Sequence, residues 1–187
     1  MTAATGSVLV CVCGGIAAYK VCPIVSRLAQ RNVPVTVAMT AEAQRFVGTV
    51  TFEALSGRCV HTDLWASSDT SDPQHLNLAR QSTVILVAPA TANMLAKMAH
   101  GIADDLVSAL LVAAPPRAIV AAPAMNEGMW NNPATQENVL ALKQRGVEMI
   151  GPESGWQACR TVGLGRMSEP EVILQVLLRR LNATSPA

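Results

Sequence analysis

The sequence predicts a three-layer α/β fold in which a parallel sheet is flanked by helices on both faces. Apolar runs of strand length at residues 7–13, 83–88 and 118–123 carry no charged side chain, as is typical of strands buried on both faces. Segments with helical spacing separate these runs, and such alternation indicates a parallel sheet. Most of the runs are followed by small or polar residues, and ligands of such sheets bind at the carboxyl ends of the strands.

Length and composition favour one domain spanning residues 1–187, half of it hydrophobic and 14% charged. The low charge suggests that part of the surface is buried against other chains. A net charge of +1 without a basic cluster argues against a nucleic-acid partner. No apolar run approaches the roughly 20 residues that span a bilayer, and residues 1–7 lack the features of a signal peptide. We therefore expect a cytoplasmic protein without a membrane segment.

The cysteines predict free thiols rather than a disulfide framework, because their number, five, is odd and no export signal is evident. The sequence holds no CxxC pair and no His-rich spacing, so we expect no metal site.

The first strand, residues 7–13, is followed by Gly14 and Gly15 and then by a helical pattern over 16–31. The apolar stripe of that helix is predicted to include Ile16, Tyr19, Ile24 and Leu28. Glycines at a helix N-terminus let an anion approach backbone N–H groups, although a tight turn that binds nothing has the same pattern. The dinucleotide fingerprint needs a third glycine and an acidic residue after the second strand. Here Thr40 follows that strand, residues 33–39, which favours a mononucleotide.

The next segments are a helix over 42–57 that ends at Gly57, a weak strand over 59–61 and a polar loop over 65–73. His75 then opens a short helix over 75–80. A helix N-terminus tends to keep an imidazole neutral and therefore basic, so His75 is a candidate general base. A structural role is the alternative.

The strand over 83–88 leads to Thr91 and Asn93, which offer a hydroxyl and an amide at its carboxyl end. They are candidates for ligand contacts or for N-caps of a helix over 94–100. A second helix, 103–114, begins with Asp104 and Asp105, whose charge suits a helix N-terminus.

The strand over 118–123 is followed by Asn126, an amide that can both donate and accept hydrogen bonds. Its place favours either a ligand contact or a turn or cap residue. A helix from Pro133 to Gly146 and a strand over 147–150 complete the sheet.

Residues 151–170 have no period and contain four glycines, which predicts an irregular lid or binding loop. Cys159 lies within it. The neighbouring Arg160 could favour the thiolate, whereas burial would oppose it. An amphipathic helix over 171–182 closes the chain.

Four motifs in order resemble those of the homo-oligomeric flavin-containing cysteine decarboxylases, in particular the phosphopantothenoylcysteine decarboxylases. They are GGIAAYK at 14–20, PATANMLAK at 89–97, PAMNEGMWNNP at 123–133 and ACxxxGxGRM at 158–167. The resemblance implies a Rossmann-like or flavodoxin-like fold and an FMN-dependent carboxy-lyase. Its substrate would be 4′-phospho-N-pantothenoyl-L-cysteine and its products 4′-phosphopantetheine and CO2, a step of coenzyme A biosynthesis.

The resemblance also implies roles for residues. His75 would be the base, Asn126 would bind the substrate carboxylate, Met129 would shape the pocket, and Cys159 would protonate the enethiol. The implied FMN contacts are Gly14, Gly15, Ile16, Thr40, Thr91, Ala92, Asn93 and Ala124.

The family further implies trimers, sometimes assembled into dodecamers, with the flavin at the subunit boundary. In many bacteria the decarboxylase is fused to a synthetase, so this chain is expected to be a stand-alone enzyme or one half of such a protein. Two residues depart from the usual motifs: Arg160 replaces a glycine, and Thr91 replaces a serine.

Three alternatives share parts of the pattern. A peptidyl-cysteine oxidative decarboxylase stops at the enethiol and does not need Cys159. A regulatory flavoprotein subunit does not need His75, Asn126 and Cys159 together. A flavin prenyltransferase shares the fold but lacks PAMNEGMW.

Overall fold

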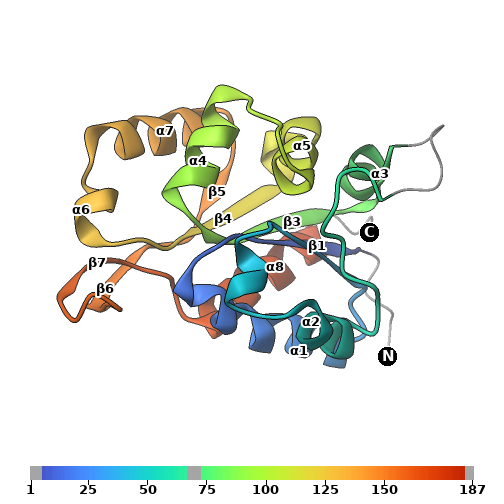
Figure 1. Ribbon diagram of the computed structural model, residues 1–187. Coiled ribbons are helices and arrows are strands. Elements are labelled where there is room, and N and C mark those ends of the chain that lie inside the picture. The colour runs from blue at the N-terminus through green and yellow to red at the C-terminus, as the bar shows by residue number, and fades with distance from the viewer. Residues whose placement is uncertain (1–5, 67–72, 184–187) are drawn as a thin grey trace.

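A five-stranded parallel sheet lies between two layers of helices, which confirms the predicted fold class (Figure 1). The computed structural model describes residues 6–66 and 73–183. The strand order is β2-β1-β3-β4-β5, the order of flavodoxin-like folds, in which β1 and β3 flank the point where the chain reverses its direction across the sheet.

The strands are short and mostly buried. β1 spans Val8–Val12, β2 Val35–Met39, β3 Val84–Ala90, β4 Ile119–Pro123 and β5 Glu148–Met149. All five lie where the apolar runs predict them. The weak strand expected over 59–61 is reduced to a single bridge between Ala38 and His61.

Alternate residues of the sheet pack against different helices. Val8 and Val10 share a core with α1 (Val21–Gln30), α2 (Thr49–Ser56) and α8 (Pro170–Ala183). Leu9 and Cys11 face α4 (Ala92–His100), α5 (Leu106–Ala113) and α7 (Pro133–Gln144). This two-sided burial is why the strands contain few polar residues.

The helix predicted over 16–31 is divided into two parts. A 3-10 segment, η1 (Ile16–Lys20), precedes α1. Ile24 and Leu28 are fully buried as predicted, but Ile16 and Tyr19 are 60% and 59% exposed. A 3-10 helix has about three residues per turn, so their face is not continuous with the buried stripe of α1.

The helix predicted over 42–57 is also interrupted: η2 (Ala43–Arg45) precedes α2. Gly57 ends α2 in the left-handed conformation, with φ of 68°, as helix-ending glycines commonly do. Two further short helices are η3 (Pro116–Ala118) and α6 (Glu127–Trp130).

The prediction of an irregular loop over 151–170 is wrong, because most of this segment forms a β-hairpin. β6 (Glu153–Trp156) pairs antiparallel with β7 (Val162–Arg166). The Arg160 N–H donates to the carbonyl of Gln157 at 2.9 Å, and the Gln157 N–H donates to the carbonyl of Thr161 at 2.8 Å. These bonds define a tight turn that carries Cys159, with Arg160 in the left-handed region at φ 65°.

α3 (Gln74–Gln81) packs on α5 and lies near the amino ends of the strands, where the Ser7 hydroxyl donates to the carbonyl of Gln81 at 2.6 Å. In Figure 1 the hairpin lies at the opposite end of the sheet. Among the described residues, we find no helix with the length and apolar character needed to cross a bilayer.

Candidate functional site

A cavity of about 630 Å³ lies at the carboxyl ends of β1 to β4 and is covered by the hairpin. Its walls come from the loops that follow these strands, from η1 and α6, and from the turn that carries Cys159. A cavity of this size suits a mononucleotide-sized ligand. The position matches the ligand site of open parallel sheets.

The cavity gathers every predicted site residue except one. The predicted residues that line it are Gly14, Gly15, Ile16, Thr40, Thr91, Ala92, Asn93, Ala124, Asn126, Met129 and Cys159. His75 is half-buried on α3 and is not part of this lining. Sequence spacing does not reveal that α3 lies beside the amino ends of the strands.

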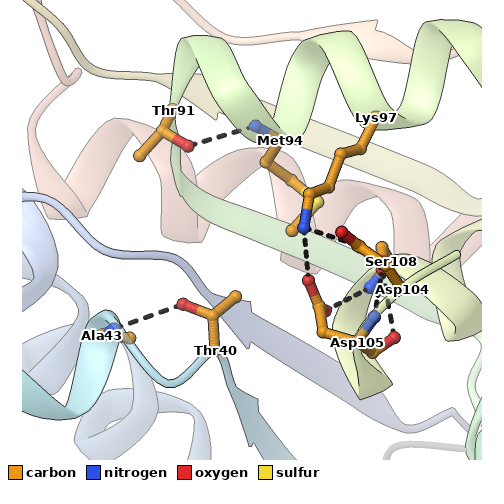
Figure 2. A network of polar contacts seen from close by, with 8 residues as sticks. All are labelled: Thr40, Ala43, Thr91, Met94, Lys97, Asp104, Asp105 and Ser108. Atoms are coloured by element: carbon orange, nitrogen blue, oxygen red, sulfur yellow. Dashed lines mark hydrogen bonds and ion pairs between the residues drawn. The ribbon is translucent and has the colours of Figure 1, made fainter. Parts of the chain in front are cut away.

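Two hydroxyl groups stand at the carboxyl ends of β2 and β3, the strands on either side of β1 (Figure 2). The Thr40 hydroxyl accepts a hydrogen bond from the Ala43 N–H at 3.2 Å, and the Thr91 hydroxyl accepts one from the Met94 N–H at 3.2 Å. Thr91 is therefore the N-cap of α4. Because each oxygen acts as the acceptor, each hydroxyl still has a proton to donate to a ligand.

Asp105 also lines the cavity, and its carboxylate is held on both oxygens. One oxygen accepts from the Ser108 N–H at 2.8 Å in a capping box, and the other accepts from the Lys97 ammonium at 2.8 Å. The same ammonium lies 2.6 Å from Asp104 (Figure 2). Burial would lower the pKa of Lys97, but the bonds to both aspartates outweigh it and leave that pKa raised.

Cys13 is buried beneath the cavity. Burial raises its pKa far above the ordinary value, and the Asp105 carboxylate raises it further. The thiol therefore stays protonated at neutral pH and cannot act as a nucleophile.

Asn126 and Cys159 come together across the cavity from two different segments. The side-chain oxygen of Asn126 accepts from the Gly128 N–H at 2.8 Å and caps α6, while its amide nitrogen donates to the Cys159 sulfur at 3.2 Å. The cap expected as one alternative is therefore present, and the amide nitrogen of the same side chain contacts Cys159.

The surroundings of Cys159 favour its thiolate. The Thr161 hydroxyl lies 3.0 Å from the sulfur. Hydrogen bonding lowers the pKa of the Cys159 thiol, with the larger effect from Thr161 and a smaller one from Asn126. The thiol is exposed rather than buried, so the opposing effect of burial is small.

Gln157 is a cavity residue with an unused donor. Its oxygen accepts from the Glu127 N–H at 3.3 Å, whereas its amide nitrogen is buried and has no hydrogen-bond partner among the described residues. A buried donor without a partner costs about 1–3 kcal/mol. An oxygen of a bound ligand would remove that cost.

Sequence reasoning missed several wall residues, namely Tyr19, Lys20, Glu42, Asp105, Trp156 and Gln157. The sequence pattern indicated Asp105 only as a charge suited to a helix N-terminus. Tyr19 resembled a core residue because the 3-10 turn was not anticipated. Within the described ranges, no cluster of three or more His, Cys, Asp or Glu side chains could hold a metal ion.

The sheet order and the cavity at the strand ends define a flavodoxin-like protein with a site for a mononucleotide-sized ligand. The chain belongs to the Flavoprotein family, whose model matches residues 3–182.

Curated relatives include the coenzyme A biosynthesis bifunctional protein CoaBC of Bacillus subtilis, 45% identical over 170 residues, and that of Mycobacterium tuberculosis, 46% identical over 180 residues. These matches cover 91% and 94% of this chain. The chain spans 42% of the length of each of these relatives.

Solved structures show the same fold over nearly the whole chain. A PPC decarboxylase with a cysteine-to-serine substitution, complexed with pantothenoylaminoethenethiol, has a TM-score of 0.84 and 29% identity, covering 96% of this chain and 99% of its own. The FMN-dependent cysteine decarboxylase SpaF has a TM-score of 0.78 and 33% identity, covering 95% of this chain and 98% of its own.

Proposed function

We propose that this chain catalyses the FMN-dependent decarboxylation of 4′-phospho-N-pantothenoyl-L-cysteine to 4′-phosphopantetheine and CO2, a step of coenzyme A biosynthesis. The observation that carries the proposal is the contact between Asn126 and Cys159 inside the cavity at the strand ends. It joins an amide that can bind a carboxylate to a thiol that can transfer a proton. The similarity to CoaBC and to PPC decarboxylase supports the same substrate.

The residues of the cavity fit FMN. Gly14, Gly15 and Ile16 place backbone N–H groups at the start of η1, where a phosphate is favoured. The hydroxyls of Thr40 and Thr91 can donate to it, and Ala92, Asn93 and Ala124 complete the expected contacts. The unpaired Gln157 donor offers a further bond. When bound, FMN would supply hydride acceptance and return at the carbon that bears the substrate sulfur.

The side chains of this chain would then direct the decarboxylation. Oxidation of the thiol-bearing carbon gives a thioaldehyde, whose C=S group accepts the electron pair of the carbon–carboxylate bond as CO2 leaves. Asn126 would orient the carboxylate through its amide nitrogen, and Met129 would bound the space beside it. Cys159 would donate a proton to the enethiol carbon that has lost CO2, while the hydride would return to the carbon that bears sulfur. The overall reaction would therefore consume one proton and be redox-neutral.

His75 can serve as the base only in an assembly, because it lies outside the cavity of its own chain. We therefore propose a homo-oligomer, a trimer or a dodecamer built from trimers, in which a second copy supplies His75. Four apolar side chains at the cavity are more than half exposed, which supports burial by another copy: Ile16, Tyr19, Met129 and Trp156.

The substrate would come from a phosphopantothenoylcysteine synthetase, either in a longer chain or as a separate protein. The partial coverage of the CoaBC relatives supports that link. We place the reaction in the cytoplasm.

Release of CO2 from two candidate substrates tests the proposal. Purified protein should release one CO2 per 4′-phosphopantetheine from 4′-phosphopantothenoylcysteine and should leave a peptide ending in cysteine unreacted. Preference for the peptide would instead support a peptidyl-cysteine decarboxylase, and a protein without bound flavin would overturn the cofactor assignment.

A further inference from the structure

The hairpin is joined to the start of α6 by hydrogen bonds that connect the two halves of the site. The Met125 N–H donates to the carbonyl of Gly165 at 2.9 Å, and the Leu164 N–H donates to the Glu127 carboxylate at 3.1 Å. The Glu127 N–H donates in return to the side-chain oxygen of Gln157 at 3.3 Å. Glu127 therefore contacts both a strand and the turn of the hairpin.

The two segments approach so closely that two positions of β7 leave little room for a side chain. A Cβ atom at Gly163 would lie 2.6 Å from a carboxylate oxygen of Glu127. A Cβ atom at Gly165 would lie 2.2 Å from the carbonyl oxygen of Met125. These glycines show that the hairpin rests directly on the segment that carries Asn126.

We propose that Glu127 is a positioning residue that holds the hairpin in the register where Cys159 meets Asn126. The role of Cys159 rests on the proposed function, but the assignment of Glu127 rests on the contacts above. Its exposed carboxylate accepts the hydrogen bond of a hairpin N–H. It stands next to Asn126 in sequence and opposite Leu164 in space, so it links the two segments that must meet.

The position of the hairpin determines which side chains bond the Cys159 thiol. The side chains bonded to the Cys159 sulfur are the uncharged Asn126, Gln157 and Thr161. Thr161 and Gln157 move with the hairpin, whereas Asn126 does not. If the hairpin moves away from α6, the sulfur keeps Thr161 but loses the Asn126 donor.

Hydrogen exchange of the FMN-bound protein tests the contact without any substrate. Glu127→Ala should speed exchange of the hairpin amides, including that of Leu164, by about 3- to 10-fold, the range expected for one hydrogen bond. Glu127→Gln keeps an acceptor oxygen, so its hairpin amides should exchange at a rate between those of Glu127→Ala and the native protein. Glu137→Ala, on the exposed face of α7, is the matched control and should leave the hairpin unchanged.

The thiol gives a second readout, which a merely structural role would not change. The pH at which Cys159 is half-alkylated, followed on its own peptide, should rise in Glu127→Ala, because Asn126 no longer stabilises the thiolate. Glu127→Gln should partly restore the native profile.

A coupled substitution makes the test sharper. Gly163→Ala should loosen the hairpin in the native background, where the new methyl group meets the Glu127 carboxylate. It should have a smaller effect in Glu127→Ala, where only the β-carbon remains, 3.1 Å from the new methyl group. Equal effects of Gly163→Ala in both backgrounds would overturn the proposal. So would unchanged hairpin exchange, or an unchanged Cys159 profile, in Glu127→Ala.

These measurements need no turnover. If the protein failed to decarboxylate its proposed substrate, the exchange and alkylation results would still decide whether Glu127 positions Cys159.

Discussion

Arg160 occupies a backbone conformation that favours glycine, and replacing it should stabilise the turn that carries Cys159. Its φ of 65° places a non-glycine residue in the left-handed region, which costs about 1–2 kcal/mol. Glycine would remove this strain but would add unfolded-state freedom worth about 0.4–1 kcal/mol. The difference predicts a gain of about 0.5–1 kcal/mol in the hairpin of Arg160→Gly.

Hydrogen exchange over residues 153–166 measures that gain. Protection of the hairpin amides in Arg160→Gly should rise by about 2- to 5-fold, the ratio that corresponds to this free energy. Arg160→Ala keeps the left-handed strain and should show no gain. Arg160→Pro should lose protection, because proline fixes φ near −65° and removes the N–H that bonds Gln157. Equal protection in Arg160→Gly and Arg160→Ala would refute the reasoning.

Three further predictions concern the site and its support. Asn126→Asp should lower kcat/KM by at least about 10-fold, because it replaces a hydrogen bond to the substrate carboxylate with repulsion between two negative charges. Steady-state kinetics measures this loss, with Asn138→Asp as the control. Unchanged kinetics in Asn126→Asp would reject the contact. Because hydrogen bonds to Thr161 and Asn126 lower the pKa of Cys159 while burial raises that of Cys22, alkylation of Cys159 should begin at lower pH than that of Cys22. Thr161→Val should move the Cys159 profile to higher pH, and no movement would exclude Thr161 as the cause. Lys97→Met should lower the free energy of unfolding by about 1 kcal/mol through the lost Asp105 bond. Lys97 also lowers the pKa of Asp104. The stabilisation from this second ion pair is therefore present above the unfolded-state pKa of Asp104 and is lost as pH falls through its folded-state pKa, so the difference between the denaturation curves of the two proteins should decrease in acid.

The sheet and most cavity residues were predictable because both depend on local patterns. A parallel strand buried on both faces must be apolar, and the residue after it, such as Thr40 or Thr91, stands at the ligand edge whatever the rest of the chain does. Asn126 was identified for the same reason. The cap made by its oxygen and the contact of its nitrogen with Cys159 depend on side-chain orientation, which the sequence does not give.

The features that sequence patterns did not predict depend mostly on contacts between segments far apart in the chain. The hairpin was missed because Gly163 and Gly165 resemble loop residues, whereas here they permit close contact with Met125 and Glu127. Ile16 was assigned to the core because a 3-10 turn and an α-helix have similar sequences at this length. His75 has the chemistry of a base, but its distance from the cavity follows from the end of the sheet at which α3 packs.

The masses of the products formed by the native protein and by Cys159→Ser test the central claim most directly. With 4′-phosphopantothenoylcysteine as substrate, the native protein should give saturated 4′-phosphopantetheine. Cys159→Ser should still release CO2 but accumulate the enethiol, which has two fewer hydrogens, because the proton donor is missing. Saturated product from Cys159→Ser at the native rate, or no CO2 from either protein, would contradict the account.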